Sequence, residues 1–201
     1  MHGYIVAGIG TEVGKTIVSA IVVEKLKADY WKPVQAGELA QTDSMTVREL
    51  APGGRAFHPE AYRLRTAVSP HAAAAIDGVR IVRERLALPH TENTLVIEMA
   101  GGLLVPLARG LSNIDLMADW GLPVVVVSSY YLGSINHTLL SLEALRVREI
   151  SVLGVVFNGE PVASSRRVIL SETGLPCLLD IAPADPLDAI WIATQAEAMS
   201  L

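Results

Sequence analysis

The chain has 201 residues, of which 51% are hydrophobic and 18% are charged, so it can bury a substantial core, and we expect one domain spanning residues 1–201. Its net charge of −5 argues against a general attraction to nucleic acid or to an anionic membrane. Cys177 is the only cysteine, which excludes a disulfide framework. No apolar run approaches the roughly 18 residues of a membrane-spanning helix. We expect a soluble, cytoplasmic protein without nucleic-acid or membrane partners.

Short apolar runs alternate with helical patterns along the chain. In chain order they predict strand 4–7, helix 15–28, strand 30–34, helix 42–50, a helix from Pro70 capped by Ser69, strand 94–98, helix 113–120, strand 123–128, helix 134–147, strand 152–157, helix 164–173 and a weaker strand 177–181. Pro33 indicates a strand end or an edge strand, and residues 52–59 are expected to form a surface loop. The alternation predicts an α/β fold with a mostly parallel sheet flanked by helices and right-handed crossovers.

The segment 8–16, GIGTEVGKT, ends like a phosphate-binding loop. The usual spacing requires glycine where Ile9 stands, but the glycines on either side of it can still bend the chain around a phosphate. Because a strand precedes the loop and a helix follows it, backbone N–H groups at the helix start can bind an anion. Lys15 can reach the outer phosphates, and the Thr16 hydroxyl can bind Mg²⁺. The alternative is a strand–turn–helix corner with an exposed lysine, and the flanking elements favour the nucleotide site.

Two carboxylates are candidates for the metal shell that a Mg²⁺-nucleotide complex requires. Glu98 ends the apolar strand TLVIE beside a glycine turn, so it faces the crevice where ligands of open α/β sheets bind. Its other interpretation is a strand-end carboxylate that faces water. Asp43 follows a loop at the start of a helix, where the helix dipole alone favours an acid. Asp43 becomes a metal-ligand candidate only in combination with Thr16 and Glu98.

Taken together, the motifs resemble those of the dethiobiotin synthetase family. The matching segments follow that family's order: GIGTEVGKT at 8–16, KPVQAG at 32–37, TDS at 42–44, SPH at 69–71, IEMAGG at 97–102, LGSINH at 132–137 and Asn158. In the last forty or so residues only LLDIAP at 178–183 is similar to the family. The resemblance implies a P-loop NTPase fold and a homodimer with active sites at the interface. It also implies an ATP- and Mg²⁺-dependent cyclo-ligase of biotin biosynthesis, which converts 7,8-diaminopelargonate and CO₂ to dethiobiotin, ADP and phosphate.

The resemblance also implies residue roles. Lys15 and Lys32 would be catalytic together with Thr11, and Lys32 would stabilise the carbamate and the migrating phosphoryl group, although a strand-end lysine by itself is more often solvated. Metal ligands would be Thr16, Asp43 and Glu98. ATP contacts would come from Glu12, Val13, Gly14, Lys15, Thr16, Asp43, Glu98, Gly101, Asn158 and Pro183. Substrate contacts would come from Glu12, Ala36, Gly37, Ser69, Pro70, Gly133, Ser134, Ile135 and Asn136.

Three positions depart from the family pattern: Gly10 replaces an acid, Ala36 a serine, and Tyr131 a lysine found in some relatives. Two other functions were compared with ring closure. A partition-type P-loop ATPase, which switches contacts with protein or DNA, commonly carries an extra lysine early in its loop, whereas this loop has only Lys15. A cobalamin-pathway amide synthetase shares the loop type but normally carries a glutamine-amidotransferase domain, for which this chain has no room.

Overall fold

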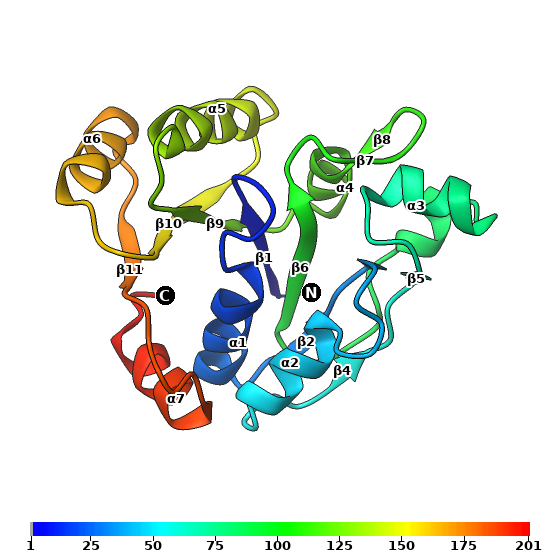
Figure 1. The fold of residues 1–201 in the computed structure, drawn as a ribbon, viewed down its shortest axis with the longest axis horizontal. Coiled ribbons are helices and arrows are strands. Elements are labelled where there is room, and N and C mark those ends of the chain that lie inside the picture. Colours follow the sequence, from blue (N-terminus) through cyan, green and yellow to red (C-terminus); the bar gives the residue numbers. More distant parts are fainter. Residues whose placement is uncertain (1) are drawn as a thin grey trace.

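The computed structural model describes residues 2–201 and contains a central sheet of seven parallel strands (Figure 1). The strand order is β11-β10-β9-β1-β6-β2-β4. The strands are β1 (Gly3–Gly8), β2 (Asp29–Trp31), β4 (Phe57–His58), β6 (Leu95–Gly102), β9 (Val124–Ser129), β10 (Val152–Asn158) and β11 (Cys177–Ile181). The prediction of a parallel α/β fold is therefore confirmed.

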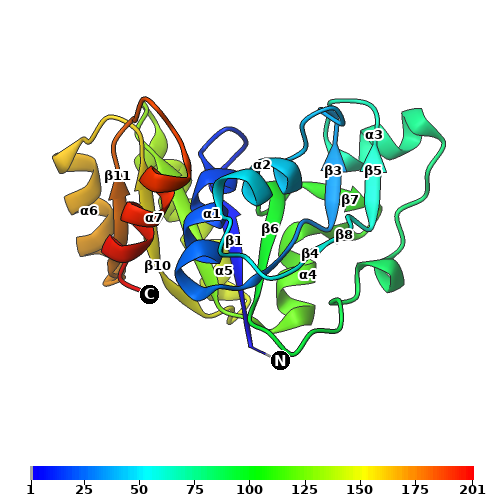
Figure 2. The ribbon, with the colours of Figure 1, turned by 90° about the horizontal axis from the view of Figure 1, so that it is seen from below.

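Helices cover both faces of this sheet (Figures 1 and 2). One layer contains α1 (Lys15–Leu26), α2 (Asp43–Leu50) and α7 (Ala189–Ala198), and the other contains α4 (Asn113–Trp120), α5 (Ser134–Val147) and α6 (Ala163–Thr173). Successive strand residues point to opposite faces, so in β1 Ile5 packs in the core under α4–α6 and Val6 in the core under α1, α2 and α7. Burial on both faces explains why the central strands read as uninterrupted apolar runs.

In the first half of the chain, the structure decides between the two alternatives for Pro33 and corrects the prediction for residues 52–59. Strand β2 is not an edge strand, because it pairs with β6 on one side and with β4 on the other. The expected surface loop 52–59 contains β4, which is the true edge of the sheet. Its short pairing is reinforced by the buried carboxylate of Asp29, which accepts the Ala56 N–H at 3.1 Å and lies 3.1 Å from His58 Nε2. Pro33 does mark the end of β2.

Several smaller elements were not predicted. Helix α7 begins after Asp188, whose side chain accepts the Trp191 N–H, and packs beside α1. Strands β3 (Val34–Ala36) and β5 (Tyr62–Leu64) pair beside α3 (Pro70–Asp77), and β7 (Pro106–Ala108) pairs with β8 (Leu111–Ser112). A short 3₁₀ helix covers Arg83–Leu86. Within residues 2–201, no helix is both long enough and apolar enough to cross a bilayer.

Candidate active site

The loop between β1 and α1 has the geometry of an anion site. Gly14 precedes α1 with φ of 94°, in the left-handed region that disfavours side chains, and a Cβ at this position would collide with Asn158 Nδ2. Because Gly14 has no side chain to cap the helix, the first N–H groups of α1 are left for a bound anion. Lys15 is buried, and its Nζ donates to the Gly10 carbonyl at 2.7 Å. The loop thus folds over the lysine that the sequence assigned to phosphate.

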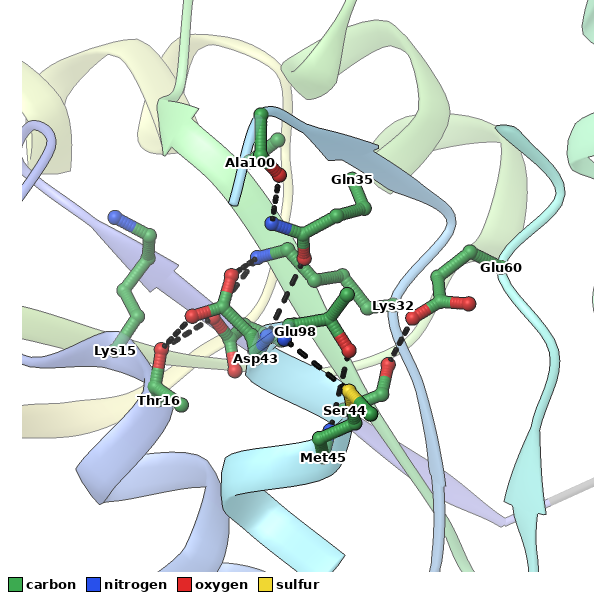
Figure 3. Close-up of polar contacts among 12 residues, drawn as sticks. Lys15, Thr16, Lys32, Gln35, Asp43, Ser44, Met45, Glu60, Glu98 and Ala100 are labelled. Atoms are coloured by element: carbon green, nitrogen blue, oxygen red, sulfur yellow. Dashed lines mark hydrogen bonds and ion pairs between the residues drawn. The ribbon is translucent and has the colours of Figure 1, made fainter. Parts of the chain in front are cut away.

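Four polar side chains from different parts of the chain converge next to this loop (Figure 3). Thr16 Oγ1, in the first turn of α1, lies 2.7 Å from Asp43 Oδ1 and 3.0 Å from Glu98 Oε1. Lys32 Nζ lies 2.7 Å from Asp43 Oδ2 and 3.0 Å from Glu98 Oε1. Asp43 is the first residue of α2, and Glu98 lies on β6 opposite Val6 of β1. The predicted metal ligands and the predicted catalytic lysine therefore form one cluster.

Burial and charge set the protonation of this cluster. Burial, with a smaller contribution from the neighbouring Lys32 charge, lowers the pKa of Lys15 to about 8. Burial alone would also lower the pKa of Lys32, but the charges of Glu98 and Asp43 outweigh it and hold that pKa above its ordinary value. Burial alone would raise the pKa of Asp43, and the Lys32 charge instead keeps it below the usual range. Lys32 and Asp43 are therefore both charged near neutral pH.

The donor chemistry of the cluster fits Mg²⁺. The Thr16 hydroxyl has one proton and can donate to only one of its two carboxylate neighbours at a time. The other carboxylate oxygen then lacks a donor from Thr16. Mg²⁺ takes oxygen ligands, commonly one or two carboxylates together with phosphate oxygens and water. Among residues 2–201, no group of three or more His, Cys, Asp and Glu side chains gathers as a metal site. The protein's share of the shell would therefore be the Thr16 hydroxyl and the carboxylates of Asp43 and Glu98.

A cavity of about 700 Å³ opens beside the loop and the carboxylates. Pockets of this size accommodate small-molecule ligands. Most of the predicted site residues line it: Thr11, Glu12, Gly14, Lys15, Thr16, Lys32, Ala36, Asp43, Ser69, Pro70, Glu98 and Gly101. Ser69, the N-cap of α3, and Pro70, its first residue, form another part of the cavity wall. Segments far apart in the sequence thus form one binding space.

Other predicted residues lie outside the lining of this cavity. The Val13 side chain is buried in the core, while its carbonyl accepts a hydrogen bond from Asn158 Nδ2 at 3.1 Å. Gly37 follows β3 and packs against Ala67. Pro183 is exposed in the loop after β11, and residues 133–136 form the start of α5, where Gly133 and Asn136 are exposed and Ser134 is buried. Asn158 is therefore near the phosphate loop, and residues 133–136 are not part of the cavity lining.

Two buried residues of the site were missed at the level of sequence. The Tyr30 hydroxyl donates to Glu98 Oε2 at 2.9 Å, and burial followed by the Glu98 charge raises the pKa of Tyr30 well above its usual range. Gln35 Oε1 accepts the Asp43 N–H at 3.3 Å (Figure 3). Alternation along β2 could have indicated Tyr30, because it lies two residues before Lys32 and therefore on the same face.

Comparisons with known proteins agree with this geometry. The AAA domain family matches residues 2–190. The ATP-dependent dethiobiotin synthetase BioD of Cytophaga hutchinsonii is 50% identical over 189 residues, which cover 93% of this chain and 91% of that protein. The ATP-dependent dethiobiotin synthetase BioD of Rhizorhabdus wittichii is 51% identical over 191 residues, covering 94% and 91%.

A solved structure of similar fold is that of a ParA family ATPase from Chlorobium tepidum TLS. It superposes with a TM-score of 0.58 and 13% sequence identity, covering 98% of this chain and 89% of that one. At this identity the likeness shows the shared P-loop fold alone. It does not favour a partition function over the one named for the much closer relatives.

Proposed function

Because the chain belongs to the ATP-dependent dethiobiotin synthetase family, we propose that it uses ATP and Mg²⁺ to join CO₂ to 7,8-diaminopelargonate and close the ureido ring of dethiobiotin in biotin biosynthesis. The observation that carries the residue assignment is the convergence of Thr16, Lys32, Asp43 and Glu98 beside the phosphate loop. The pattern of relatives does not favour the partition-type and cobalamin-pathway alternatives.

The phosphate loop would hold the triphosphate. The N–H groups at the start of α1 would donate to phosphate oxygens, and Lys15 would turn from the Gly10 carbonyl to the outer phosphates. Thr16, Asp43 and Glu98 would hold Mg²⁺, which neutralises charge on the phosphates when bound. Asn158, whose amide both donates and accepts, is suited to the adenine edge, with Pro183 alongside. With Asn158 and Pro183, the proposed nucleotide site extends from the phosphate loop to the adenine base.

The reaction implied by the family has three steps. One amine of the substrate adds to CO₂ and loses a proton, which gives a carbamate. A carbamate oxygen then attacks the γ-phosphorus, the bond to the ADP oxygen breaks, and a carbamic–phosphoric anhydride forms. The second amine attacks the carbonyl carbon, loses a proton and displaces phosphate, which closes the ring. The carbamate and the phosphoryl group are both anionic. The buried ammonium group of Lys32 is therefore suited to stabilise them.

The substrate would occupy the part of the cavity between the loop and α3. Thr11 and Glu12 approach it from the loop, and Ala36, Ser69 and Pro70 from the other wall. Residues 133–136, at the start of α5, do not line this cavity, and we assign their N–H groups to the substrate carboxylate in the site of a second copy, as the family resemblance implies. The family resemblance is the basis for proposing a homodimer. We further propose that the chain acts as one domain in the cytoplasm, where ATP is supplied.

A ring-closure assay tests the function. Purified protein is incubated with 7,8-diaminopelargonate, bicarbonate, Mg²⁺ and ATP, and dethiobiotin and ADP are measured by mass spectrometry. We expect the two products in equal amounts, and no product from Lys15→Ala, which removes the phosphate-binding ammonium. Hydrolysis of ATP that is indifferent to the diamine, with no diamine binding, would contradict the proposal and favour a regulatory ATPase.

A further inference from the structure

We propose that Tyr30 is a positioning residue for the metal site, because its hydroxyl fixes the buried Glu98 carboxylate in the orientation that presents Oε1 to the metal. The proposal rests on the proposed function, which places Glu98 in the Mg²⁺ shell. Tyr30 is not part of the cavity lining, and its hydroxyl donates to Glu98. It would act through Glu98 alone.

The two oxygen atoms of Glu98 have different partners. Oε1 lies 3.0 Å from both Thr16 Oγ1 and Lys32 Nζ, on the side of the cavity. Oε2 points the other way and accepts the Tyr30 hydroxyl at 2.9 Å. A carboxylate oxygen can only accept, so the phenol is the donor. The hydrogen bond therefore determines which oxygen remains for the metal.

The position of Tyr30 is set by the sheet and the core. Tyr30 pairs with Val96 of β6, so the alternation along both strands places Tyr30 on the same face as Glu98. Its ring is fully buried and packs against Phe57 at a centroid distance of 6.0 Å. Because the ring is held on all sides, the hydroxyl has little freedom to leave Glu98. This rigid support comes from the edge of the sheet rather than from the cavity.

Removing the hydroxyl should loosen the metal site. Glu98 is almost fully buried, so without the Tyr30 hydroxyl its Oε2 loses a hydrogen-bond donor at a position largely closed to solvent. The carboxylate would then rotate so that both oxygens compete for Lys32 and Thr16. Outer partners of metal ligands typically change metal affinity by about 10- to 100-fold when they are removed. We expect a loss at the lower end of this range, because Asp43 and Thr16 remain.

The test is the variant Tyr30→Phe, with Mn²⁺ as the probe. Free Mn²⁺ is measured by electron paramagnetic resonance in the presence of saturating ADP. We expect about tenfold weaker Mn²⁺ binding. In the activity assay, the Mg²⁺ concentration for half-maximal rate should rise by about the same factor, while kcat at saturating Mg²⁺ changes by less than about twofold. An unchanged Mn²⁺ affinity would overturn the proposal.

Tyr62→Phe is the matched control. Tyr62 is also buried, and its hydroxyl accepts a backbone hydrogen bond from Val82 at 2.9 Å, away from Glu98. The control variant also loses a buried, hydrogen-bonded tyrosine hydroxyl, so it should lose some stability and keep its Mn²⁺ affinity. An equal loss of metal binding in Tyr62→Phe would show a general structural effect and would also overturn the proposal.

Glu98→Gln separates this inference from the proposed function. If Glu98→Gln leaves Mn²⁺ binding unchanged, the metal site itself is misplaced and the positioning role falls with it. If Glu98→Gln weakens binding and Tyr30→Phe does not, only the role of Tyr30 is lost. Adding Tyr30→Phe to Glu98→Gln should have no further effect on Mn²⁺ affinity, because both changes act through one carboxylate.

A second measurement needs no change at Tyr30 and covers the case in which Tyr30→Phe does not fold. The protein is labelled with ¹³C at the ζ carbon of tyrosine, and the signals of the other tyrosines are assigned by single Tyr→Phe variants. Addition of Mg²⁺ and ADP should shift the Tyr30 signal, because its acceptor changes partners, and Glu98→Gln should abolish the shift. A Tyr30 signal that does not move would overturn the proposal.

Discussion

The charged side chain of Lys32 is almost fully buried. Its burial is tolerated because the ammonium group pairs with the carboxylates of Asp43 and Glu98. Lys15 also interacts electrostatically with both carboxylates, so the two acids have two lysine charges near them. In the proposed function, Lys32 would hold the two carboxylates in place before nucleotide binds and stabilise anionic reactants afterwards. Lys32 therefore connects the stability of the site with its chemistry.

The first prediction concerns that chemistry. Lys32→Ala should reduce dethiobiotin formation by about 100- to 1,000-fold, the usual effect of removing one preorganised charge contact. Nucleotide binding should remain, because Lys15 and the α1 N–H groups are unchanged; a fluorescent ATP analogue measures it. Lys25→Ala, whose Nζ donates only to the Ala196 carbonyl among the described contacts, is the control and should keep wild-type activity. Wild-type-like synthesis by Lys32→Ala would remove Lys32 from the reaction.

The second prediction concerns the unusual spacing of the phosphate loop. A Cβ at Gly8 would lie 2.6 Å from Val13 Cγ2, whereas at Gly10 the nearest atom is 4.0 Å away. Gly8→Ala should therefore distort the loop and weaken ATP binding by at least about tenfold. Gly10→Ala should bind ATP like wild type, and its unfolding free energy should change by less than about 1 kcal/mol. Calorimetric titration of both variants decides this, and equal effects would contradict the steric argument.

These residues also show what the sequence can reveal about the site. Lys15, Thr16 and Glu98 follow from local patterns, because strand, turn and helix put them at one edge of a parallel sheet. Alternation could indicate the face on which Tyr30 lies, but the hydrogen bonds of Tyr30 and Gln35 depend on which atoms of distant segments meet in the fold. The motif KPVQAG names Gln35 but does not say that its amide accepts from Asp43.

At the scale of elements, Asp29 joins three segments at the start of β2. Its buried carboxylate accepts hydrogen bonds from Ala56 N–H, Thr91 Oγ1 and Asn93 Nδ2, and His58 Nε2 lies 3.1 Å away. Burial alone would raise the pKa of Asp29, but these hydrogen bonds, led by that of Thr91, hold it below its ordinary value. Asp29 thus stabilises the edge of the sheet on which Tyr30 and Lys32 depend.

The third prediction uses this pKa. Because the folded-state pKa is lowered, the contribution of Asp29 is present above its unfolded pKa of about 4 and is lost as the pH falls through the folded value. Asp29→Asn should lower the free energy of unfolding by about 1–3 kcal/mol near neutral pH, with the difference from wild type shrinking below about pH 4. Urea unfolding at both pH values measures it. The control is Asp119→Asn, which changes a more exposed ion pair with Arg83 and should unfold like wild type. A difference between Asp29→Asn and wild type that does not depend on pH would contradict the assignment.

Elements were predicted where one pattern dominates. The bounds of α4, α5 and β11 agree with the expected ranges, because caps, glycines and apolar runs coincide there. Strand β4 could not be predicted, since two residues carry no periodicity and their pairing depends on Asp29 from another segment. Helix α7 was missed because its apolar residues do not form one clear stripe, although Asp188 is a recognisable N-cap.

At the scale of the whole molecule, the sequence predicts that α5 is a helix but not which of its faces stays uncovered. Leu140 and Val147 lie seven residues apart, hence on one side of α5, and are 61% and 63% exposed. Leu132, just before the helix, is also exposed. Apolar side chains gathered in this way commonly mark a protein interface. This surface is continuous with residues 133–136, which the proposed function assigns to the substrate of a second copy.

The fourth prediction follows from that continuity. Leu140→Glu should convert a dimer to a monomer in sedimentation velocity, because a charge would be buried at the interface. It should also reduce ring closure while leaving ATP binding intact, since the phosphate loop lies within one chain. Ile190→Glu on α7 is the matched control: Ile190 is 78% exposed, on the opposite helical layer, so its variant should remain dimeric and active. A wild-type protein that is monomeric and active would exclude the shared site, because residues 133–136 could then serve no second cavity.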